Sequence, residues 1–282
     1  MTDWLHALDY WSYQFIATVW GMYWPAFLII AAFTVAERLF PLEKNLPWRA
    51  VRFNLAWQVF ALSAFVALSW SAWGDIFRWL YGLAGRPIIY VARSDSWLIE
   101  SGRILLIIAV NDLLLYWVHR LSHAVPALWM VHRFHHNEEH LHAATMTRQH
   151  WLSFPIAQVL LLPTVWLWGG DAAPQTVGIV VTAIAVFHHS NLRLGLGRLT
   201  PIIVGPQLHR LHHARDRASH DSNFAGVFPL WDIVFGTYRA PRPGEFGATG
   251  LATQKPSSEY WRSFFQPLVD WWAMATGVFK RK

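Results

Sequence analysis

Long apolar runs separated by short polar stretches dominate residues 15–187 of the chain. A helix needs about 20 apolar residues to cross the hydrocarbon core of a bilayer. Two runs meet this length, a third does so with Asn111 and Asp112 inside it, and two shorter ones flank a link suited to a helical hairpin. In chain order the runs are 15–36, 53–73, 97–118, 151–168 and 175–187. They predict an all-α integral membrane protein with four to five hydrophobic helices.

Composition agrees with a membrane protein. Of the 282 residues, 54% are hydrophobic and 14% are charged, whereas about a quarter of the residues are charged in a typical soluble domain. The sequence contains no linker, low-complexity tract or internal repeat, so residues 1–282 are expected to form one domain. The chain has no cysteine, which excludes disulfides and thiolate metal ligands.

The distribution of basic residues predicts an orientation in the membrane. The net charge is +6, and the basic residues lie beside apolar runs, which favours anionic lipid headgroups over nucleic acid as partners. Arg38, Lys44, Arg49 and Arg52 occupy the connection after the first run, and Lys and Arg prefer cytoplasmic loops. Residues 119–150 and the tail after His189 are then also expected on the cytoplasmic side. If the protein is bacterial, the membrane is the inner membrane.

The histidines are clustered in a way that composition does not explain. All of them except His6 lie between His119 and His220, and most fall into one HxxxH and two HxxHH motifs. The members are His119 and His123; His132, His135 and His136; and His209, His212 and His213. Side chains three and four positions apart share a helix face, so each motif can direct its imidazoles toward one point.

Metal binding is the chemistry that suits these motifs. Imidazole is mostly neutral near pH 7 and is then a ligand, whereas a face that binds headgroups is expected to use Lys and Arg. Eight imidazoles exceed the needs of one four-coordinate zinc ion, so two metal ions are implied. The ligand type leaves zinc, copper, iron and nickel open.

Asp112 and Tyr116 share a stripe of the third helix with His119 and His123, because the four residues are separated by four, three and four positions. Ionisable residues inside a membrane are usually functional, and metal-bound histidines commonly donate their second N–H to a carboxylate. We therefore expect Asp112 to lie below the ligands as a hydrogen-bond partner. The alternative is a buried carboxylate paired with Arg103 or with another helix.

The three motifs and the short sequences around them resemble the membrane-bound fatty acid hydroxylase and sterol desaturase superfamily of di-iron oxygenases. These short sequences are Asn111-Asp112 through Tyr116-Trp117, Phe187-His188-His189-Ser190-Asn191, Asn223-Phe224-Ala225-Gly226 and Trp231-Asp232-Ile233-Val234-Phe235-Gly236-Thr237-Tyr238. The resemblance covers about residues 100–240. It implies a cytoplasmic, histidine-rich helical cap that holds a dinuclear metal site.

The resemblance also implies an activity, with two iron ions and dioxygen oxidising a C–H bond of a lipid or sterol-like substrate. It makes Asp112 and Tyr116 candidate catalytic residues and adds two residues to the candidate ligands. The full ligand set is His119, His123, His132, His135, His136, His188, His189, His209, His212 and His213. A separate electron-transfer protein is expected, because the chain has no flavin, haem or iron–sulfur fingerprint.

Several points stay open from the residues alone. His140, His142 and His150 are either ligands or solvated loop residues, while His220 and His6 are placed outside the site. A His-rich metal transporter would hold its ligands near the bilayer midplane, and a zinc-dependent lipid hydrolase would need about three. The number of histidines and their position at helix ends disfavour both classes. Hydroxylation is favoured over desaturation, and the substrate is not readable.

Overall fold

The computed structural model describes most of the chain. The described residues are 24–69, 75, 76, 79, 82, 89–90, 94–160, 168–169, 174–252, 256 and 259–277. The beginning of the first predicted run, the end of the second and the middle of the fourth therefore lie outside the described residues, as do His6 and most of the loop between the second and third runs.

The predicted apolar runs are helical wherever the structure describes them, except at both ends of the fourth run. Residues 24–39 form a helix, and the next three runs correspond to α2 (Trp48–Ser69), α4 (Trp97–Ala124) and α6 (Ser153–Leu160). The fifth corresponds to α8 (Pro174–His189). Among the described helices, only Trp48–Leu68 is both long and apolar enough to cross a membrane, and Val177–His189 is apolar but shorter.

The remaining elements are short helices and one minimal strand pair. They are α5 (Pro126–His136), η1 (Ala143–Thr147), η2 (Gly197–Leu199), α9 (Pro206–His212), η3 (Arg217–Ser219), α10 (Leu230–Val234) and α11 (Tyr260–Ala275). The strands β1 (Ile89–Tyr90) and β2 (Trp168–Gly169) pair in parallel over two residues. The fold is therefore helical as predicted, apart from this pairing, which involves the final residue of the fourth predicted run.

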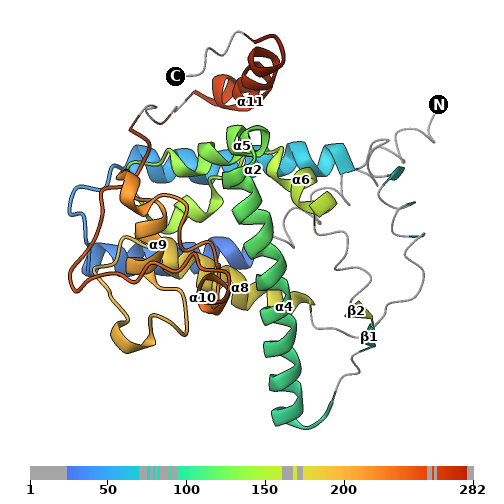
Figure 1. Cartoon of the computed structure of the whole chain (residues 1–282), viewed down its shortest axis with the longest axis vertical. Coiled ribbons are helices and arrows are strands. Elements are labelled where there is room, and N and C mark those ends of the chain that lie inside the picture. The colour runs from blue at the N-terminus through green and yellow to red at the C-terminus, as the bar shows by residue number, and fades with distance from the viewer. Residues whose placement is uncertain are drawn as a thin grey trace, which may run out of the picture.

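The long helix α4 organises the molecule. In Figure 1 it runs along the vertical axis, with α5 at its upper end, α8 and α9 beside it, and α2 lying across the top. Pro126 ends α4 and begins α5, since proline cannot continue a helix but suits the first turn of the next. The chain turns sharply there, and the histidines at the end of α4 meet those of α5.

The loop between α5 and α6 is folded inward against α2. The Trp57 indole N–H donates to Gln149 O at 2.7 Å, and Asn54 Nδ2 donates to Glu138 Oε2 at 3.1 Å. Arg148 is 1% exposed and donates to Phe134 O and Asn54 Oδ1, both at 3.0 Å. These bonds satisfy a charge that would otherwise be costly to bury, and they fix the backbone that follows the second histidine motif.

Candidate metal centre

Nine histidines converge in two groups at the junction of α4, α5, α8 and α9. The first, here the five-histidine group, contains His119, His123, His132, His136 and His212. The second, the four-histidine group, contains His135, His189, His209 and His213. Within each group, one nitrogen of every ring lies within 4.8 Å of the others. The structure thus brings together all predicted ligands except His188.

Helix geometry explains how each HxxHH motif serves both groups. Successive residues of an α-helix are rotated by about 100°, so positions i and i+4 nearly coincide in direction while i+3 diverges from i+4. Accordingly, His132 and His136 enter one group and His135 enters the other. The α9 motif repeats the pattern with the groups exchanged: His209 and His213 join one group and His212 joins the other.

The imidazole nitrogens face one another at short range. His136 Nε2 lies 3.1 Å from the Nε2 atoms of both His123 and His212. His189 Nε2 lies 3.1 Å from His135 Nε2 and 3.0 Å from His209 Nε2. Lone pairs facing at such distances require a proton or a cation between them.

The second ring nitrogens show which atom presents the lone pair. His119 Nδ1 lies 2.7 Å from Phe224 O, and His189 Nδ1 lies 2.7 Å from Ala185 O. A carbonyl oxygen only accepts, so each Nδ1 carries the hydrogen and each Nε2 is free to bind a metal. His119 Nε2 is buried without a hydrogen-bond partner. The donor set therefore fits a pair of metal ions.

Burial keeps these imidazoles neutral. Desolvation lowers the pKa of His135 and His136 well below the usual value of 6.5, and the neighbouring imidazoles lower it further. The pKa values of His209, His212 and His213 on α9 and at its end are lowered for the same reasons. Neutral imidazole is the form that binds metal, so the site is prepared for ligation at neutral pH.

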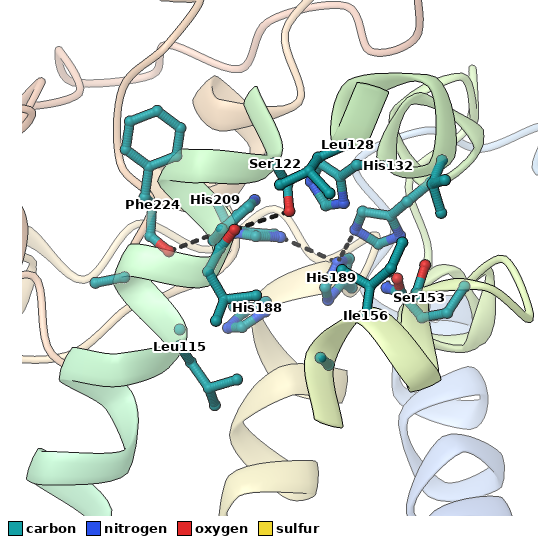
Figure 2. Close-up of a pocket in the computed structure, with 18 residues that line it drawn as sticks. Leu115, Ser122, Leu128, His132, Ser153, Ile156, His188, His189, His209 and Phe224 are labelled. Carbon is teal, nitrogen blue, oxygen red and sulfur yellow. Dashed lines mark hydrogen bonds between the residues drawn. The ribbon is translucent and has the colours of Figure 1, made fainter. Parts of the chain in front are cut away.

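His188 lies next to the centre but outside both groups. Its ring centroid is 4.0 Å from that of His209 and 4.6 Å from that of His189. Its Nδ1 atom is buried without a hydrogen-bond partner, and the side chain lines a cavity (Figure 2). The structure therefore places His188 beside the two histidine groups, whereas its neighbour His189 belongs to the four-histidine group.

The contacts of Asp112 differ from the sequence-based prediction, which named no partner for Tyr116. Asp112 accepts backbone N–H groups from Gly226 and Val227 at 3.0 Å and from Phe228 at 2.8 Å. The Tyr116 hydroxyl lies 2.9 Å from Thr237 Oγ1 and accepts from Arg120 Nη1 at 3.1 Å. Asp112 is therefore a support for the loop after the third motif, whose buried N–H groups need acceptors, and not the predicted partner of a histidine.

A second buried carboxylate, Asp232, supports the site, a role that the sequence did not predict. It is fully buried and accepts from Phe224 N at 2.7 Å, Ala225 N at 2.9 Å and Thr237 Oγ1 at 2.7 Å. It thereby holds the carbonyl of Phe224 against His119. The signal in the sequence was the short sequence that begins at Trp231-Asp232, which marked the resemblance but gave no indication of its partners.

The loop histidines bind protein groups. His140 Nδ1 lies 2.8 Å from Glu43 Oε2, and His142 Nε2 lies 3.3 Å from Asn54 Nδ2. His150 Nε2 lies 3.1 Å from the carbonyls of Ser263 and Phe264. None of the three belongs to either described group, and the exposed His220 does not either.

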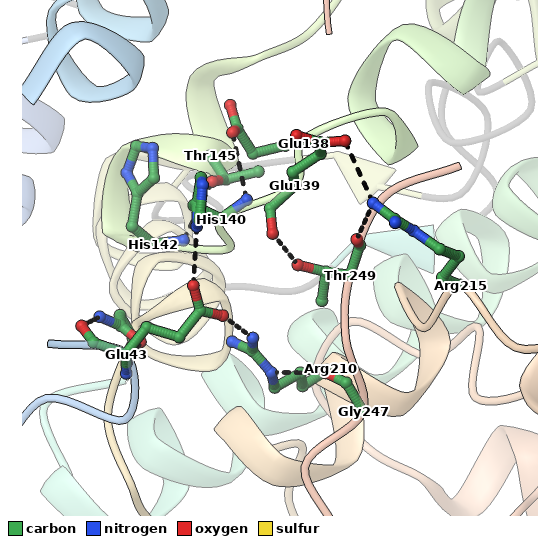
Figure 3. Close-up of polar contacts among 11 residues, drawn as sticks. Glu43, Glu138, Glu139, His140, His142, Thr145, Arg210, Arg215, Gly247 and Thr249 are labelled. Carbon is green, nitrogen blue, oxygen red and sulfur yellow. Dashed lines mark hydrogen bonds and ion pairs between the residues drawn. The ribbon is translucent and has the colours of Figure 1, made fainter. Parts of the chain in front are cut away.

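Polar contacts tie α9 to the rest of the site (Figure 3). Arg210 donates from Nε to Gly247 O at 2.9 Å and pairs with Glu43, which also contacts His140. Arg215 pairs with Glu139 at 3.1 Å just beyond the motif. Since α9 has only seven residues, these contacts help to fix the orientation of His209 and His212 on the helix and of His213 at its end.

Two cavities connect the centre to apolar surroundings. The first, of about 250 Å³, contacts six histidines and is otherwise lined mainly by apolar side chains such as Leu115, Val118 and Val131 (Figure 2). The second, of about 470 Å³, has only apolar residues in its lining and shares Leu128 and Ile156 with the first. An apolar path of this kind suits an alkyl chain.

A third cavity, of about 440 Å³, reaches the centre from another side. It is lined by His123, His136, His212 and His213 and by exposed polar residues that include Arg217 and Asp221. It shares no lining residue with the apolar cavities. The two histidine groups therefore lie between an apolar and a polar opening.

Comparisons with known proteins give the same picture as the geometry. Residues 104–237 match the family model described as Fatty acid hydroxylase. Human alkylglycerol monooxygenase is 31% identical over 167 residues, which are 56% of this chain and 36% of that protein. Ornithine lipid hydroxylase OlsE of Rhizobium tropici is 29% identical over 238 residues, 78% of this chain and 69% of that protein. No solved structure matches the chain.

The chain is thus similar to the fatty acid hydroxylase family over residues 104–237, and its relatives are members of the superfamily that the sequence motifs resemble. Methylsterol monooxygenase 1-3 of Arabidopsis thaliana, 28% identical over 141 residues, 47% of this chain and 46% of that protein, belongs to the same set of relatives. The relatives named here are monooxygenases and hydroxylases, that is, oxidoreductases. The chain spans about a third of the length of the alkylglycerol monooxygenases that it matches.

Proposed function

We propose that the protein is a membrane-bound di-iron monooxygenase that hydroxylates a C–H bond of a lipid. The observation that supports this most directly is the pair of histidine groups at the inner end of an apolar cavity. Two iron ions, held by the five- and four-histidine groups, would activate dioxygen for oxidation of the substrate. Ligation by these residues and the identity of the metal are parts of the proposal.

The residues of the chain would perform the remaining tasks. Neutral imidazoles bind the metal ions, and the carbonyls of Phe224, Ser222 and Ala185 orient three of them. Leu128, Ile156 and their neighbours exclude water from the cavity and hold an alkyl chain against the centre. Electrons must come from a separate protein, for which the polar cavity at His123 and His213 offers an approach.

The names of the relatives favour hydroxylation of a polar lipid. Two of the matched proteins act as hydroxylase or monooxygenase on ornithine lipid and alkylglycerol, respectively, by their names. We therefore propose an alkyl chain carrying a polar head as the substrate class, at a bilayer into which the chain is inserted with its histidines facing the cytoplasm. The metal transporter and the zinc hydrolase draw no support from these relatives.

Lipid profiling tests this proposal. Cells that express the protein would be compared by mass spectrometry with cells that express His135→Ala, with His6→Ala as the control outside the histidine motifs. We expect one lipid class to gain one oxygen atom in the wild type and in the control, only when dioxygen is supplied. Loss of a lipid headgroup without oxygen, or metal uptake without a lipid product, would instead support the hydrolase or the transporter.

A further inference from the structure

A short segment after the third motif receives the second nitrogens of the five-histidine group. His119 Nδ1 lies 2.7 Å from Phe224 O, and His212 Nδ1 lies 2.8 Å from Ser222 O. A third member, His123, also turns its Nδ1 toward this segment. Residues 221–224 therefore orient three of the five rings at once.

The contact made by His123 differs in kind from the other two. Its Nδ1 lies 3.3 Å from Oδ1 of Asp221, so its acceptor is a carboxylate, whereas the other two acceptors are backbone carbonyls. The Asp221 side chain is 74% exposed in the polar cavity, while the His123 side chain is only 8% exposed. A carboxylate that accepts from a metal-bound imidazole increases the donor strength of the ring.

The backbone of this segment is held in an uncommon conformation. Asp221 and Asn223 have φ values of 55° and 57°, in the left-handed region that few residues other than glycine, asparagine and aspartate adopt. Arg239 N donates to Asn223 Oδ1 at 2.9 Å, and Asn223 Nδ2 donates to Arg239 O at 3.0 Å. Strain that the surroundings maintain in this way is typical of functional positions, and here it turns Asp221 toward His123.

The four-histidine group has no comparable partner among the described contacts. His135 Nδ1 lies 3.2 Å from the side-chain amide of Gln149, and His189 Nδ1 donates to a carbonyl of its own helix. The Nδ1 atoms of His209 and His213 are buried without a hydrogen-bond partner. Among the described residues, the only carboxylate acceptor therefore belongs to the five-histidine group.

We propose that Asp221 is a positioning residue that makes the two metal positions unequal. It would fix His123 in the tautomer with hydrogen on Nδ1 and strengthen the Nε2 ligand, so that the five-histidine group depends on a carboxylate and the four-histidine group does not. The inference rests on the proposed function, because it requires both groups to bind metal.

Asp221→Asn isolates the charge. Asparagine tolerates the left-handed backbone and keeps an Oδ1 acceptor, so the fold of the segment is retained. Asp216→Asn is the matched control, because Asp216 is an exposed aspartate of the same loop that accepts from Ala218 N and Ser219 Oγ and contacts no ring of either group. Both variants would be purified in detergent, stripped of metal and titrated with Co²⁺ alone, following the visible absorption of the bound ion.

We expect two binding steps in the wild type and in Asp216→Asn. In Asp221→Asn one step should weaken about 10- to 100-fold, the usual effect of losing such a partner, with a changed absorption band, while the other step is unchanged. Asp221→Gly, which relieves the backbone and removes the acceptor, should weaken the same step at least as much. If Asp221 acted only through its strained backbone, both Co²⁺ binding steps would instead recover in Asp221→Gly.

Three results contradict the inference. If Asp221→Asn titrates like Asp216→Asn in both steps, or if both steps weaken equally, Asp221 does not distinguish the two positions. Recovery of both steps in Asp221→Gly overturns it as well. A wild-type protein that binds fewer than two ions contradicts the proposed dinuclear centre itself, so the two failures are distinguishable.

Discussion

Single residues decide which atoms of the centre can bind a metal. His188 and His189 are adjacent at the end of α8, and only His189 belongs to a histidine group. Its Nδ1 is committed to Ala185 O, and its Nε2 faces His135 and His209. The His188 ring packs at a tilt against that of His209 and lines the apolar cavity instead.

We predict that His189→Ala loses metal and His188→Ala does not. Removing His189 leaves three imidazoles in its group, whereas removing His188 takes away a side chain outside both groups. Metal content per chain, measured by elemental analysis after mild purification, should fall toward one ion in the first variant and stay at two in the second. Equal loss in both variants would return His188 to the ligand set.

The Asp112 carboxylate accepts three backbone N–H groups, at Gly226, Val227 and Phe228, and we predict that the loop depends on them. Asp112→Asn replaces one oxygen by an NH₂ donor, which faces N–H groups and cannot accept them. The expected loss of stability is about 1–3 kcal/mol, seen as a lower melting temperature with weaker metal retention. An inactive variant with an unchanged melting temperature and full metal content would support the catalytic role predicted from the sequence.

The sequence indicated that the motif histidines would lie close together, but it did not indicate which residues would support them. Spacing within a helix is a local property, so His132, His135 and His136 could be assigned to a common site without any structure. The partners of Asp112 lie more than a hundred positions away in the chain, and nothing local indicates them. Adjacent residues of a helix point in different directions, so His188 and His189 were expected to diverge, but whether His188 is a ligand or a neighbour depends on where the end of α8 meets α9.

Elements far from the motifs also support the centre. The C-terminal helix α11 packs on α5, which carries three of the histidines. Arg133 of α5 pairs with Asp270, and the Trp271 indole N–H donates to Ala127 O at 2.8 Å. The sequence does not indicate this role of α11, because the helix carries no motif and its contacts form only in the folded chain.

His150 joins the histidine-rich loop to α11 and makes this contact sensitive to pH. Its Nε2–H lies 3.1 Å from the carbonyls of Ser263 and Phe264, and burial lowers its pKa to about 4. An unfolded chain binds this proton below about pH 6.5, whereas the folded protein does not until about pH 4. Stability attributable to His150 is therefore lost as the pH falls through this interval.

We predict that His150→Gln flattens the acid part of the stability curve. Glutamine keeps a donor and an acceptor but does not titrate. The wild type should lose about 3 kcal/mol of unfolding free energy between about pH 6.5 and 4, and the variant should not. The measurement is the free energy of unfolding as a function of pH, with His220→Gln as an exposed control. Parallel curves for all three proteins would show that His150 is not the source.

The apolar helices of the molecule could be predicted from the sequence. Their packing, which determines where the histidine site lies, could not. Hydropathy predicted the helices because each apolar run is continuous, as in α2 and α8. It could not predict how they pack, since the apolar faces carry no signal that distinguishes one neighbour from another. The convergence of α4, α5, α8 and α9 depends on sharp turns such as that at Pro126 and on long-range contacts such as the Arg210–Glu43 pair.

The length of α4 bears on which side of the membrane holds the histidine groups. Residues of α4 rise by about 1.5 Å each, so its first turn lies about 40 Å from His123, which exceeds a bilayer core of about 30 Å. α4 is not among the helices whose composition alone indicates a crossing, but the charge of Asp112 within it is satisfied by the 226–228 backbone. We therefore expect Asp95, before α4, to lie outside the cell and the histidines to lie in the cytoplasm.

Cysteine labelling tests this arrangement without interference, because the chain has no native cysteine. Single substitutions Asp95→Cys, Glu139→Cys and Arg217→Cys would be probed in intact cells and in inverted vesicles with a membrane-impermeant thiol reagent. Glu139 and Arg217 flank the second and third motifs, so both should react only in inverted vesicles, and Asp95 only in intact cells. Reaction of Asp95 from the same side as Arg217 would show that α4 does not cross. Labelling of Glu139 and Arg217 from opposite sides would separate the second and third motifs by a bilayer, and no shared metal centre is compatible with that result.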